Sequence, residues 1–493
     1  MNQLSRIYRT SLSLLTDLYE VTMAYGHWKA GREGVQAVFY LFFRTAPFGG
    51  GFALACGAET ALEFLRDFRV SDDDRAYLAT LRGADGSPLF EPAFLDYLGD
   101  LRITCDIDIV PEGTIVFPHE PLVRVRGPII EAQIIETALL TLVNFQTLIA
   151  TKAARVCFAA QGEPVLEFGL RRAQGIDGGL SASRAAYIGG CVATSNLLAG
   201  KLFGIPVQGT HAHSWVMSFD DELESFEAYA RAMPNNCVFL VDTYDTLEGV
   251  RRAVTVGRSL EAAGHRFLGI RLDSGDLAYL SKQAREILDG AGFPHTVIAA
   301  SSELDENIIS SLKLQGAKIT VWGVGTRMVT AFDQPALGGV YKLSAIREPG
   351  GAWEPRVKLS EQAVKTTTPG LLQLRRFEAD GEFAGDMIYD ELEPPEPGAD
   401  MMIVDPVDMT RRKRFDPAST WSDVLVPAFR GGQLVYDPPP LDAVRAYAQA
   451  QLSHVHEGIR RFVNPHRYPA GLEAGLHRRK TELILRMRGE QPE

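Results

Sequence analysis

Between Val165 and Gly323 the sequence alternates short apolar runs with helical segments, and this alternation constrains the fold more than any other feature of the chain. The runs are expected to be strands, and they comprise residues 165–170, 207–209, 238–242, 267–273, 297–301 and 319–323. Successive strand ends are nearly evenly spaced, with 31 residues from Asp242 to Asp273 and 28 from Asp273 to Ser301. Repeated strand–helix units predict a parallel sheet. With about six units, we expect an incomplete or irregular (β/α) barrel rather than an open dinucleotide-binding sheet, and no GxGxxG follows the first strand.

Polar, charged or glycine residues occupy nearly all of the predicted strand ends. In chain order these ends are Arg171-Arg172, Thr210 to Ser214, Asp242-Thr243, Arg271 to Asp276, Ser301 to Glu303 and Gly323 to Arg327. Chemistry in such barrels takes place at the carboxyl ends of the strands. The sequence therefore predicts an active site at this end of the barrel.

Two of these strand ends suit a phosphate group. Gly323, Gly325 and Thr326 allow close approach of the backbone to an anion and supply N–H donors and a hydroxyl. Ser301 and the residue after it precede a helix expected over 304–314, whose N-terminus favours an anion. Each of these loops is also compatible with simple helix capping, but two at adjacent strand ends favour phosphate binding.

The segment from Arg271 to Asp276 combines a guanidinium with two carboxylates. Its residues are compatible with a salt bridge and a cap for the helix expected at 277–288. They also suit binding of sugar hydroxyls and of a magnesium-bound pyrophosphate, because carboxylates are ligands for Mg²⁺ and arginine pairs with phosphate oxygens.

Three regions are expected from the pattern of elements. Residues 1–130 predict an N-terminal α+β domain, 131–345 the α/β barrel domain, and 346–493 a C-terminal extension that packs back on the N-terminal domain. Residues 131–160 read as one long helix, and residues 181–201 as another.

Composition bears on whether the protein binds nucleic acid or a membrane, and on the cell compartment in which it is expected. A net charge of −12 argues against nucleic-acid binding, and no apolar stretch long enough to span a membrane is evident, so neither partner is expected. The five cysteines are odd in number and lack CxxC spacing, which is typical of reduced thiols in a cytoplasmic protein.

Several motifs together resemble the nicotinate phosphoribosyltransferase family. They are EFGLRRAQGIDGGLSAS from residue 167, GTHAHS from residue 209, DLYE from residue 17, IRLDSGDL from residue 270 and NPHRYP from residue 464. The resemblance covers almost the whole chain. It implies an enzyme of NAD salvage that forms nicotinate mononucleotide and pyrophosphate from nicotinate and phosphoribosyl pyrophosphate. It also implies Mg²⁺, ATP as a co-substrate consumed through a phosphorylated histidine, and a homodimer with shared active sites.

The resemblance assigns roles to individual residues. His213 would be the phosphorylated histidine, and Tyr19, Phe168, Arg171 and Thr210 would bind nicotinate, with Tyr19 serving the partner's site. Taken by itself, Tyr19 points away from the apolar stripe of its helix and would be an exposed tyrosine. Arg271, Asp273, Ser301, Gly323, Gly325 and Thr326 would hold the phosphoribosyl and pyrophosphate groups, with Asp273 also a candidate metal ligand. A structural role for His211 is equally compatible with the sequence.

Three alternatives remain open at this stage, and the first is a nicotinamide phosphoribosyltransferase. In nicotinamide-using relatives an aspartate aligns with Ser195, and it would repel a carboxylate substrate, so Ser195 favours nicotinate. A non-catalytic barrel that senses phosphosugars is the second alternative, and quinolinate phosphoribosyltransferase, with a similar barrel but a shorter chain, is a more distant third.

Overall fold

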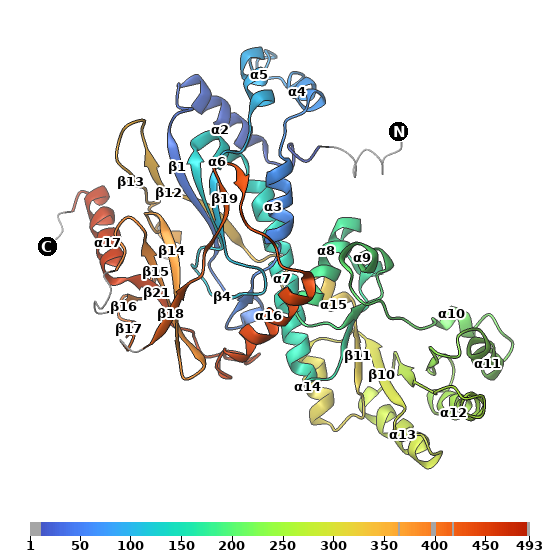
Figure 1. Ribbon diagram of the computed structural model, residues 1–493. Helices are drawn as coiled ribbons and strands as arrows, with labels where there is room; N and C mark the ends of the chain where they lie inside the picture. Colours follow the sequence, from blue (N-terminus) through green and yellow to red (C-terminus); the bar gives the residue numbers. More distant parts are fainter. Residues whose placement is uncertain (1–10, 363–364, 396–400, 417–418, 491–493) are drawn as a thin grey trace. The chain divides into compact units, whose positions relative to one another are not determined.

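The computed structural model describes residues 11–362, 365–395, 401–416 and 419–490. It divides into two compact units, each formed by more than one segment of the chain. The first unit comprises residues 1–147, 336–440 and 450–493, and the second comprises residues 148–335 and 441–449. Helix α7 (Glu136–Ala160) and helix α16 (Leu441–Ser453) each contribute to both units (Figure 1).

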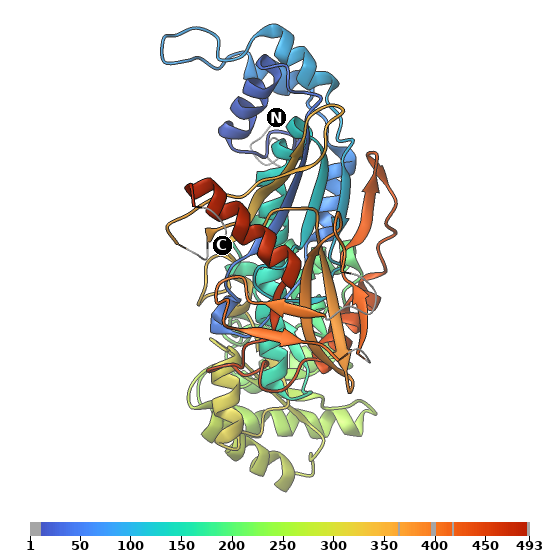
Figure 2. The same ribbon diagram turned by 90° about the vertical axis from the view of Figure 1, so that its left-hand side faces the viewer.

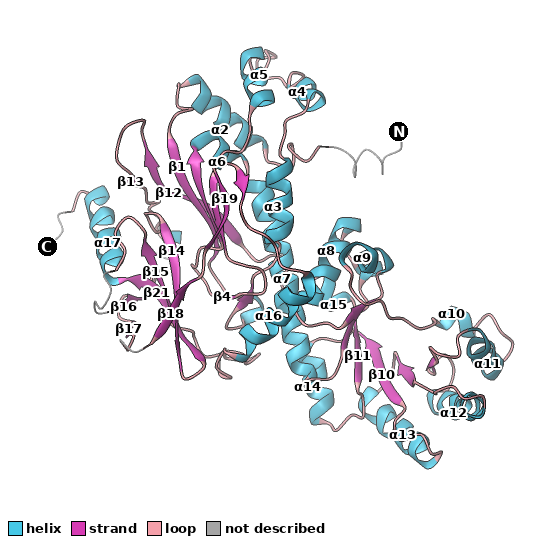
Figure 3. Ribbon diagram, viewed as in Figure 1, coloured by secondary structure: helices cyan, strands magenta, loops and turns pink. Residues whose placement is uncertain are grey.

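A six-stranded parallel sheet forms the centre of the second unit, and helices surround it (Figure 3). Its strands are β6 (Val165–Glu167), β7 (Ala193–Thr194), β8 (Val238–Leu240), β9 (Gly269–Leu272), β10 (Val297–Ser302) and β11 (Val321–Val324). The order in the sheet is β7-β6-β11-β10-β9-β8. Strands β6 and β11 are therefore paired, and the ring of strands is continuous except between β7 and β8. This is the incomplete (β/α) barrel that the sequence predicts.

The break between β7 and β8 is filled by the segment that follows β7. Val207 forms a parallel bridge with Thr194 of β7. On the other side, the backbone N–H of Leu240 in β8 donates to the imidazole Nε2 of His211 at 3.3 Å. A side chain thus supplies one acceptor that a neighbouring strand would otherwise provide.

The helices of the second unit follow the strands, as expected for a barrel. They are α8 (Gly175–Ile188), α9 (Leu197–Phe203), α10 (His213–Val216), α11 (Glu222–Ala232), α12 (Thr246–Ala262), α13 (Leu277–Gly290), α14 (Glu306–Leu314) and α15 (Thr326–Val329), with the short η2 (Leu170–Arg172) after β6. Asp245, Asp276 and Asp305 cap α12, α13 and α14 through hydrogen bonds from backbone N–H groups.

The prediction of one helix over residues 181–201 was wrong. Helix α8 ends at Ile188, the short strand β7 follows, and α9 begins only at Leu197. Gly190 has φ of 120°, which breaks the helix. A Cβ at Gly189 would lie 2.5 Å from the carbonyl oxygen of Ala150, so α8 ends where it packs closely on α7.

Two antiparallel or mixed sheets build the first unit. One has the order β13-β12-β1-β5-β3-β19-β20 and the other β17-β16-β21-β15-β14-β18. The first contains β1 (Gln36–Phe43), β3 (Asp106–Ile109), β5 (Val123–Pro128), β12 (Gly339–Arg347), β13 (Glu354–Pro355), β19 (Val426–Arg430) and β20 (Gln433–Leu434). The second contains β14 (Leu372–Ala379), β15 (Glu382–Asp390), β16 (Met402–Val404), β17 (Arg412–Arg414), β18 (Thr420–Asp423) and β21 (Ala470–Glu473).

Helices and a small ribbon complete the first unit. They are α2 (Leu18–Lys29), η1 (Pro47–Gly49), α3 (Ala58–Asp67), α4 (Asp72–Leu78), α5 (Pro92–Asp100), α6 (Ile129–Ile134), α17 (Ala474–Arg488) and the ribbon of β2 (Ala53–Leu54) with β4 (Ile115–Val116). Helix α17 packs against β16 and β21 and lies beside the second sheet (Figures 1 and 2). Leu476 of this helix shares a buried cluster with Tyr40 of β1, so residues far apart in the sequence share one core.

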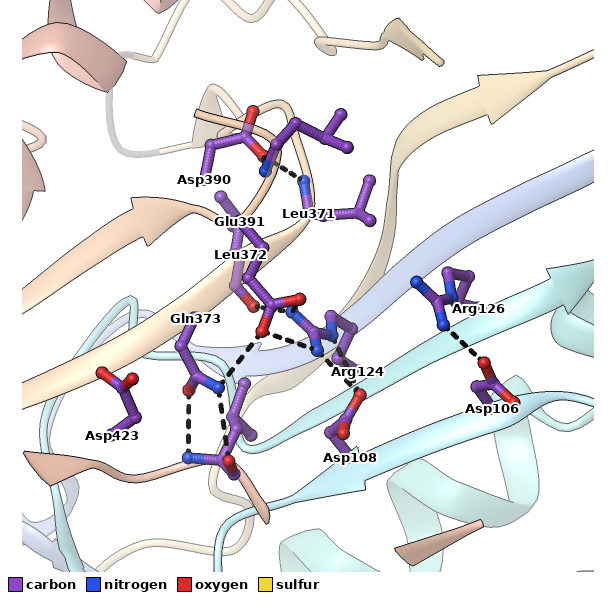
Figure 4. A network of polar contacts seen from close by, with 12 residues as sticks. Asp106, Asp108, Arg124, Arg126, Leu371, Leu372, Gln373, Asp390, Glu391 and Asp423 are labelled. Atoms are coloured by element: carbon purple, nitrogen blue, oxygen red, sulfur yellow. Dashed lines mark hydrogen bonds and ion pairs between the residues drawn. The ribbon is translucent and has the colours of Figure 1, made fainter. Parts of the chain in front are cut away.

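Apolar and ionic contacts join the two sheets of the first unit. Tyr40 and Phe42 of β1 pack in one buried cluster with Leu374 of β14 and Leu476 of α17. Beside this cluster Arg124 of β5 donates hydrogen bonds to the carboxylate of Asp108 and to the carbonyl of Leu372, and it pairs with Glu391 (Figure 4). The Arg124 guanidinium thereby links the two sheets through paired, satisfied charges.

Residues Ile129–Ala160, which form α6 and α7, are the only stretch of the described residues long and apolar enough to qualify as a membrane span by length and composition. Of its most apolar window, 61% is buried within the protein, as in a core helix.

Candidate active site

A cavity of about 370 Å³ opens at the carboxyl ends of the barrel strands in the second unit. Ten of the residues predicted from the sequence line it, namely Phe168, Arg171, Thr210, His213, Arg271, Asp273, Ser301, Gly323, Gly325 and Thr326. They lie in or shortly after β6, β9, β10 and β11 and in the segment 209–213, so the parallel sheet brings together residues far apart in the sequence. Tyr19 belongs to the first unit, where it lies on α2 with 47% of its surface exposed.

The end of β11 and the residue after it lie against Phe168. A Cβ at Gly323 would be 2.8 Å from Phe168 Cδ2, and one at Gly325 would be 3.2 Å from the Phe168 carbonyl oxygen. Gly323 therefore leaves room for the Phe168 ring, and Gly325 leaves room for the Phe168 main chain. The hydroxyl of Thr326, which lines the cavity, donates to the carboxylate of Glu303 at 3.2 Å.

The end of β10 is held in an unusual backbone conformation. Ser302 has φ of 142°, a region that residues other than glycine rarely adopt. Its neighbour Ser301 is buried and donates its hydroxyl hydrogen bond to Asp273 at the end of β9. Strain of this kind, on the order of 1–3 kcal/mol, concentrates at ligand-binding sites.

His213 lies between two carboxylates. Its Nε2 is 3.7 Å from Asp273 Oδ2 and 4.0 Å from Asp242 Oδ1, and its Nδ1 is 3.2 Å from the Thr243 hydroxyl. Asp242 is fixed in turn, because its Oδ2 accepts from the Asp273 backbone N–H at 3.1 Å and from the Ser274 hydroxyl at 2.6 Å. The imidazole is therefore oriented by partners on both sides, with part of its ring open to the cavity.

Arg271 holds the loop that carries His213. Its guanidinium donates to the Thr210 hydroxyl at 2.7 Å and to the His211 carbonyl at 3.2 Å. Burial lowers the pKa of Arg271, while the carboxylates of Asp273 and Asp242 oppose this shift. Its Nε has no hydrogen-bond partner among the described residues although it is buried, so one charged donor remains for an anionic ligand.

A buried carboxylate anchors the turn that presents Phe168 and Arg171. Glu167, only 1% exposed at the end of β6, accepts hydrogen bonds from the hydroxyls of Ser183 at 2.8 Å and Thr194 at 2.6 Å, and from the backbone N–H of Gly169. This role of Glu167 was not predicted from the sequence. The only available signal was a charged residue inside an otherwise apolar strand.

Three further residues were predicted only as members of polar strand ends, without individual roles. They are Arg172, which lies beside Arg171, Glu303, which faces Thr326, and Thr243, which contacts His213. Arg172 and Glu303 were visible in the sequence as polar strand-end residues, but the identity of their contacts depends on the folded barrel.

His211 lies among aromatic rings rather than facing only the cavity. It is 8% exposed, and its ring centroid is 4.8 Å from that of Tyr229. Burial lowers the pKa of His211 to about 4. Since its Nε2 accepts a hydrogen bond from Leu240, the ring is neutral and serves the barrel structure.

The environment of Tyr19 is acidic. Burial, followed by the charges of Glu136 and Glu20, raises the pKa of Tyr19 to about 12. Burial also raises the pKa of Glu136 to about 7. The Tyr19 phenol is therefore protonated at neutral pH, with its ring accessible on the surface of the first unit.

The cavity has oxygen donors that suit a hard divalent cation. Among the described residues no three His, Cys, Asp or Glu side chains are grouped as a metal site. Asp273 and Asp242 nevertheless lie close together, and Asp242 Oδ1 is a buried acceptor with no hydrogen-bond partner in the described structure. One or two carboxylates, completed by water and phosphate oxygens, are the usual protein ligands of Mg²⁺.

Comparisons with known proteins agree over most of the chain. Residues 14–144 match the N-terminal domain of nicotinate phosphoribosyltransferase, residues 165–368 match the nicotinate phosphoribosyltransferase family, and residues 373–480 match the C-terminal domain. The chain is 43% identical to the nicotinate phosphoribosyltransferase of Bacillus subtilis, over 96% of this chain and 95% of that one. It is 37% identical to the human enzyme of the same name, over 94% and 95% of the two chains. The crystal structure of human nicotinic acid phosphoribosyltransferase superposes with a TM-score of 0.83 and covers 95% of this chain and 100% of that chain, at 34% identity. The chain therefore belongs to the nicotinate phosphoribosyltransferase family.

Proposed function

We propose that this protein transfers the phosphoribosyl group of phosphoribosyl pyrophosphate to the ring nitrogen of nicotinate, forming nicotinate mononucleotide and pyrophosphate in NAD salvage. The observation that carries the proposal is the strand-end cavity, where anion donors, two carboxylates and an aromatic ring come together in a chain of this family.

The reaction breaks the bond between ribose C1 and the pyrophosphate oxygen, and a bond from the nicotinate nitrogen to C1 replaces it. Positive charge develops on the ribose and negative charge on the leaving pyrophosphate, so the site must stabilise charge rather than supply a strong base. The free Nε–H of Arg271 and the loop of Gly323 to Thr326 offer donors for phosphate oxygens. The carboxylate of Asp273, which lines the cavity, suits the ribose hydroxyls and the developing positive charge, and the buried carboxylate of Asp242 lies beside it.

Nicotinate binding is assigned to the turn after β6. Arg171 offers a guanidinium for the nicotinate carboxylate, Thr210 a hydroxyl, and Phe168 a ring face. Ser195 is exposed and lines the same cavity. An uncharged residue at this place leaves the substrate carboxylate without a repelling neighbour, which supports nicotinate over nicotinamide.

ATP hydrolysis is proposed to be coupled to the transfer through phosphorylation of His213. A neutral imidazole is a nucleophile, and it attacks the terminal phosphorus of ATP while ADP leaves. The carboxylates of Asp242 and Asp273 and the hydroxyl of Thr243 fix the orientation of the His213 ring. Later transfer of the phosphoryl group to water restores His213.

Mg²⁺ fits the oxygen donors at the ends of β8 and β9. Asp273, with Asp242 beside it, would hold the ion, which would neutralise charge on the pyrophosphate.

A homodimer with shared active sites is part of the proposal. Helix α2 and the residues before it expose Leu12, Leu15, Leu18, Tyr19 and Met23. In the second unit, α9 exposes Leu197, Leu198 and Leu202. Exposed apolar groups gathered on single helices are typical of surfaces covered by a partner, here a second copy of the chain. A cytoplasmic location is also proposed, and the five free cysteines support it.

The proposal is tested by measuring pyrophosphate release with phosphoribosyl pyrophosphate and Mg²⁺, comparing nicotinate with nicotinamide, each with and without ATP. Wild type is expected to need nicotinate and to respond to ATP, whereas His213→Ala should lose the ATP response. A preference for nicotinamide would overturn the substrate assignment. Binding of phosphoribosyl pyrophosphate without release would overturn the enzymatic role and leave the sensing barrel. An equal ATP response in His213→Ala would refute the phosphohistidine alone.

A further inference from the structure

A cluster of charged side chains joins helix α7 to the segments that follow β10 and β11. Lys152 of α7 is fully buried, and its Nζ is 2.7 Å from Glu306 Oε2 and 2.7 Å from Asp333 Oδ2. Arg155, three residues further along α7, donates from its Nε to Glu306 Oε1 at 2.8 Å. Glu306 is the first residue of α14, and Asp333 follows α15. None of these four is among the described residues that line the strand-end cavity.

Each of the two segments held by Lys152 carries a residue of that cavity. Glu306 comes five residues after Ser301, and Asp333 comes seven residues after Thr326. Between Thr326 and Asp333 the chain is compact, since α15 fills residues 326–329 and a backbone hydrogen bond of 3.3 Å closes the next turn. A shift of Glu306 or Asp333 is therefore passed over a few residues to the hydroxyls expected to bind phosphate.

Buried ion pairs of this kind point to a role in geometry rather than in stability. Removing an ammonium and a carboxylate from water costs free energy that their attraction only roughly offsets, and apolar residues of similar volume often stabilise a fold equally well. Two contacts of 2.7 Å from one ammonium nevertheless fix both carboxylates in place. The hydrogen bond from Lys152 also holds the pKa of Asp333 below its ordinary value, so this carboxylate stays ionised and paired at neutral pH.

We propose that Lys152 is a positioning residue for phosphoribosyl pyrophosphate, because it holds the segments after β10 and β11 at the spacing at which Ser301 and Thr326 bind phosphate oxygens of one ligand. This inference rests on the function proposed for the barrel. Lys152 does not touch the ligand and acts through Glu306 and Asp333.

The first test is the variant Lys152→Met, which removes the ammonium and keeps a side chain of similar length. Binding of phosphoribosyl pyrophosphate with Mg²⁺ is measured by titration calorimetry without nicotinate, and initial rates give KM and kcat. We expect the Kd and the KM for phosphoribosyl pyrophosphate to rise about tenfold, the effect of losing a charged contact. The KM for nicotinate and kcat should stay within about twofold of wild type, because the nicotinate contacts are unchanged. A thermal melt checks that the variant is folded.

The double variant Lys152→Met/Glu306→Gln separates positioning from charge balance. It removes the carboxylate that Lys152→Met leaves short of a partner, so its melting temperature should recover toward that of wild type. The segments still lack their common contact on α7, so the KM for phosphoribosyl pyrophosphate should stay raised. Recovery of the wild-type KM in the double variant would overturn the proposal, since Lys152 would then serve only to neutralise Glu306.

Asp333→Ala tests the same inference without disturbing the buried pair of Lys152 and Glu306. The Asp333 side chain is 40% exposed, so its removal should leave the fold intact. It frees only the segment after β11, and the Kd for phosphoribosyl pyrophosphate is expected to rise roughly threefold. Lys318→Met is the matched control, because Lys318 is an exposed lysine of the same unit that precedes β11, and it should behave as wild type.

Three results would count against the inference in different ways. Unchanged binding of phosphoribosyl pyrophosphate in folded Lys152→Met, or in Asp333→Ala if Lys152→Met does not fold, would overturn it and leave the proposed function in place. An equal rise in the KM for nicotinate would also overturn it, since Lys152 would then support the barrel in general. A wild-type protein that does not bind phosphoribosyl pyrophosphate would overturn both the inference and the proposed function.

Discussion

At the scale of single residues, the contact between Gly323 and Phe168 gives a sharp prediction. In Gly323→Ala the added methyl would lie 2.8 Å from Phe168 Cδ2, so the ring must shift. We expect the KM for nicotinate to rise roughly 2- to 10-fold, since an aromatic contact is worth about 0.5–1.5 kcal/mol. Steady-state kinetics with nicotinate varied would measure it, with Gly290→Ala as control, because no atom lies within 4 Å of a Cβ there. An unchanged KM would show that the Phe168 ring does not define the nicotinate site.

The lowered pKa of His211 predicts that the protein loses stability in acid. Its folded pKa of about 4 is below the ordinary value of 6.5, so the unfolded chain binds a proton that the folded chain does not. The free energy of unfolding that His211 contributes is complete above pH 6.5 and is lost as the pH falls toward 4, by on the order of 2–3 kcal/mol.

Urea unfolding of wild type and His211→Gln at several pH values would measure this loss. The variant should show a shallower decrease over that range, and His295→Gln, at an exposed position, should follow wild type. Parallel curves for wild type and His211→Gln would contradict the prediction.

The residues that line the cavity could be predicted where a polar side chain directly follows an apolar strand, because the change from apolar to polar residues marks the strand end. Arg271, Asp273 and Thr326 were predicted in this way, and all three line the cavity. The role of Glu167 could not be predicted, since it depends on hydroxyls of Ser183 and Thr194 that only the folded barrel brings near.

At the scale of elements, the side chain of Asp305 binds both the N-terminus of α14 and Arg327 of α15, the short helix that follows β11. Asp305 is 2% exposed and its Oδ1 accepts from the N–H groups of Asn307 and Ile308, while its Oδ2 pairs with Arg327 at 2.6 Å. Asp305→Asn would place an amide beside the Arg327 guanidinium. We expect a loss of about 1–3 kcal/mol in stability and a higher KM for phosphoribosyl pyrophosphate.

Denaturant unfolding and initial rates would measure the two effects of Asp305→Asn. Asp245→Asn, which alters the cap of α12 on an exposed residue, should cost less than about 1 kcal/mol and leave the KM unchanged. If both variants change the KM alike, Asp305 has no special connection to the loop.

The elements of the barrel could be predicted where strands are apolar on both faces, because such strands read as continuous hydrophobic runs. Strands β8 to β11 lie within or close to the predicted runs. Strand β7 has only two residues, Ala193 and Thr194, and carries no such signal. These two residues were therefore predicted to be part of the helix over 181–201. Helix α8 ends earlier because Gly189 packs closely on α7, a contact that the local sequence does not reveal.

At the scale of the whole molecule, the proposed dimer predicts complementation between two inactive variants. Tyr19→Ala and Arg171→Ala remove residues from different units of the chain. If each site takes Tyr19 from one chain and Arg171 from the other, a mixed dimer has one intact site. Equal mixing of the two variants after subunit exchange should then recover about a quarter of wild-type activity.

The control for this experiment is each variant mixed with itself, which should recover nothing. Activity that stays at the level of the separate variants, despite exchange of subunits, would contradict shared sites.

The break in the ring of strands has a consequence for how opening of the barrel can be followed. The N–H of Leu240 in β8 is protected by the imidazole of His211 and not by a neighbouring strand. Its rate of hydrogen–deuterium exchange therefore reports how often the segment carrying His211 swings away, while amides of β9 and β10 report opening of the sheet itself. His213, the proposed nucleophile, is two residues further along the same loop. The exchange rate of the Leu240 amide in the edge strand β8 therefore also measures how often the segment that carries His213 moves.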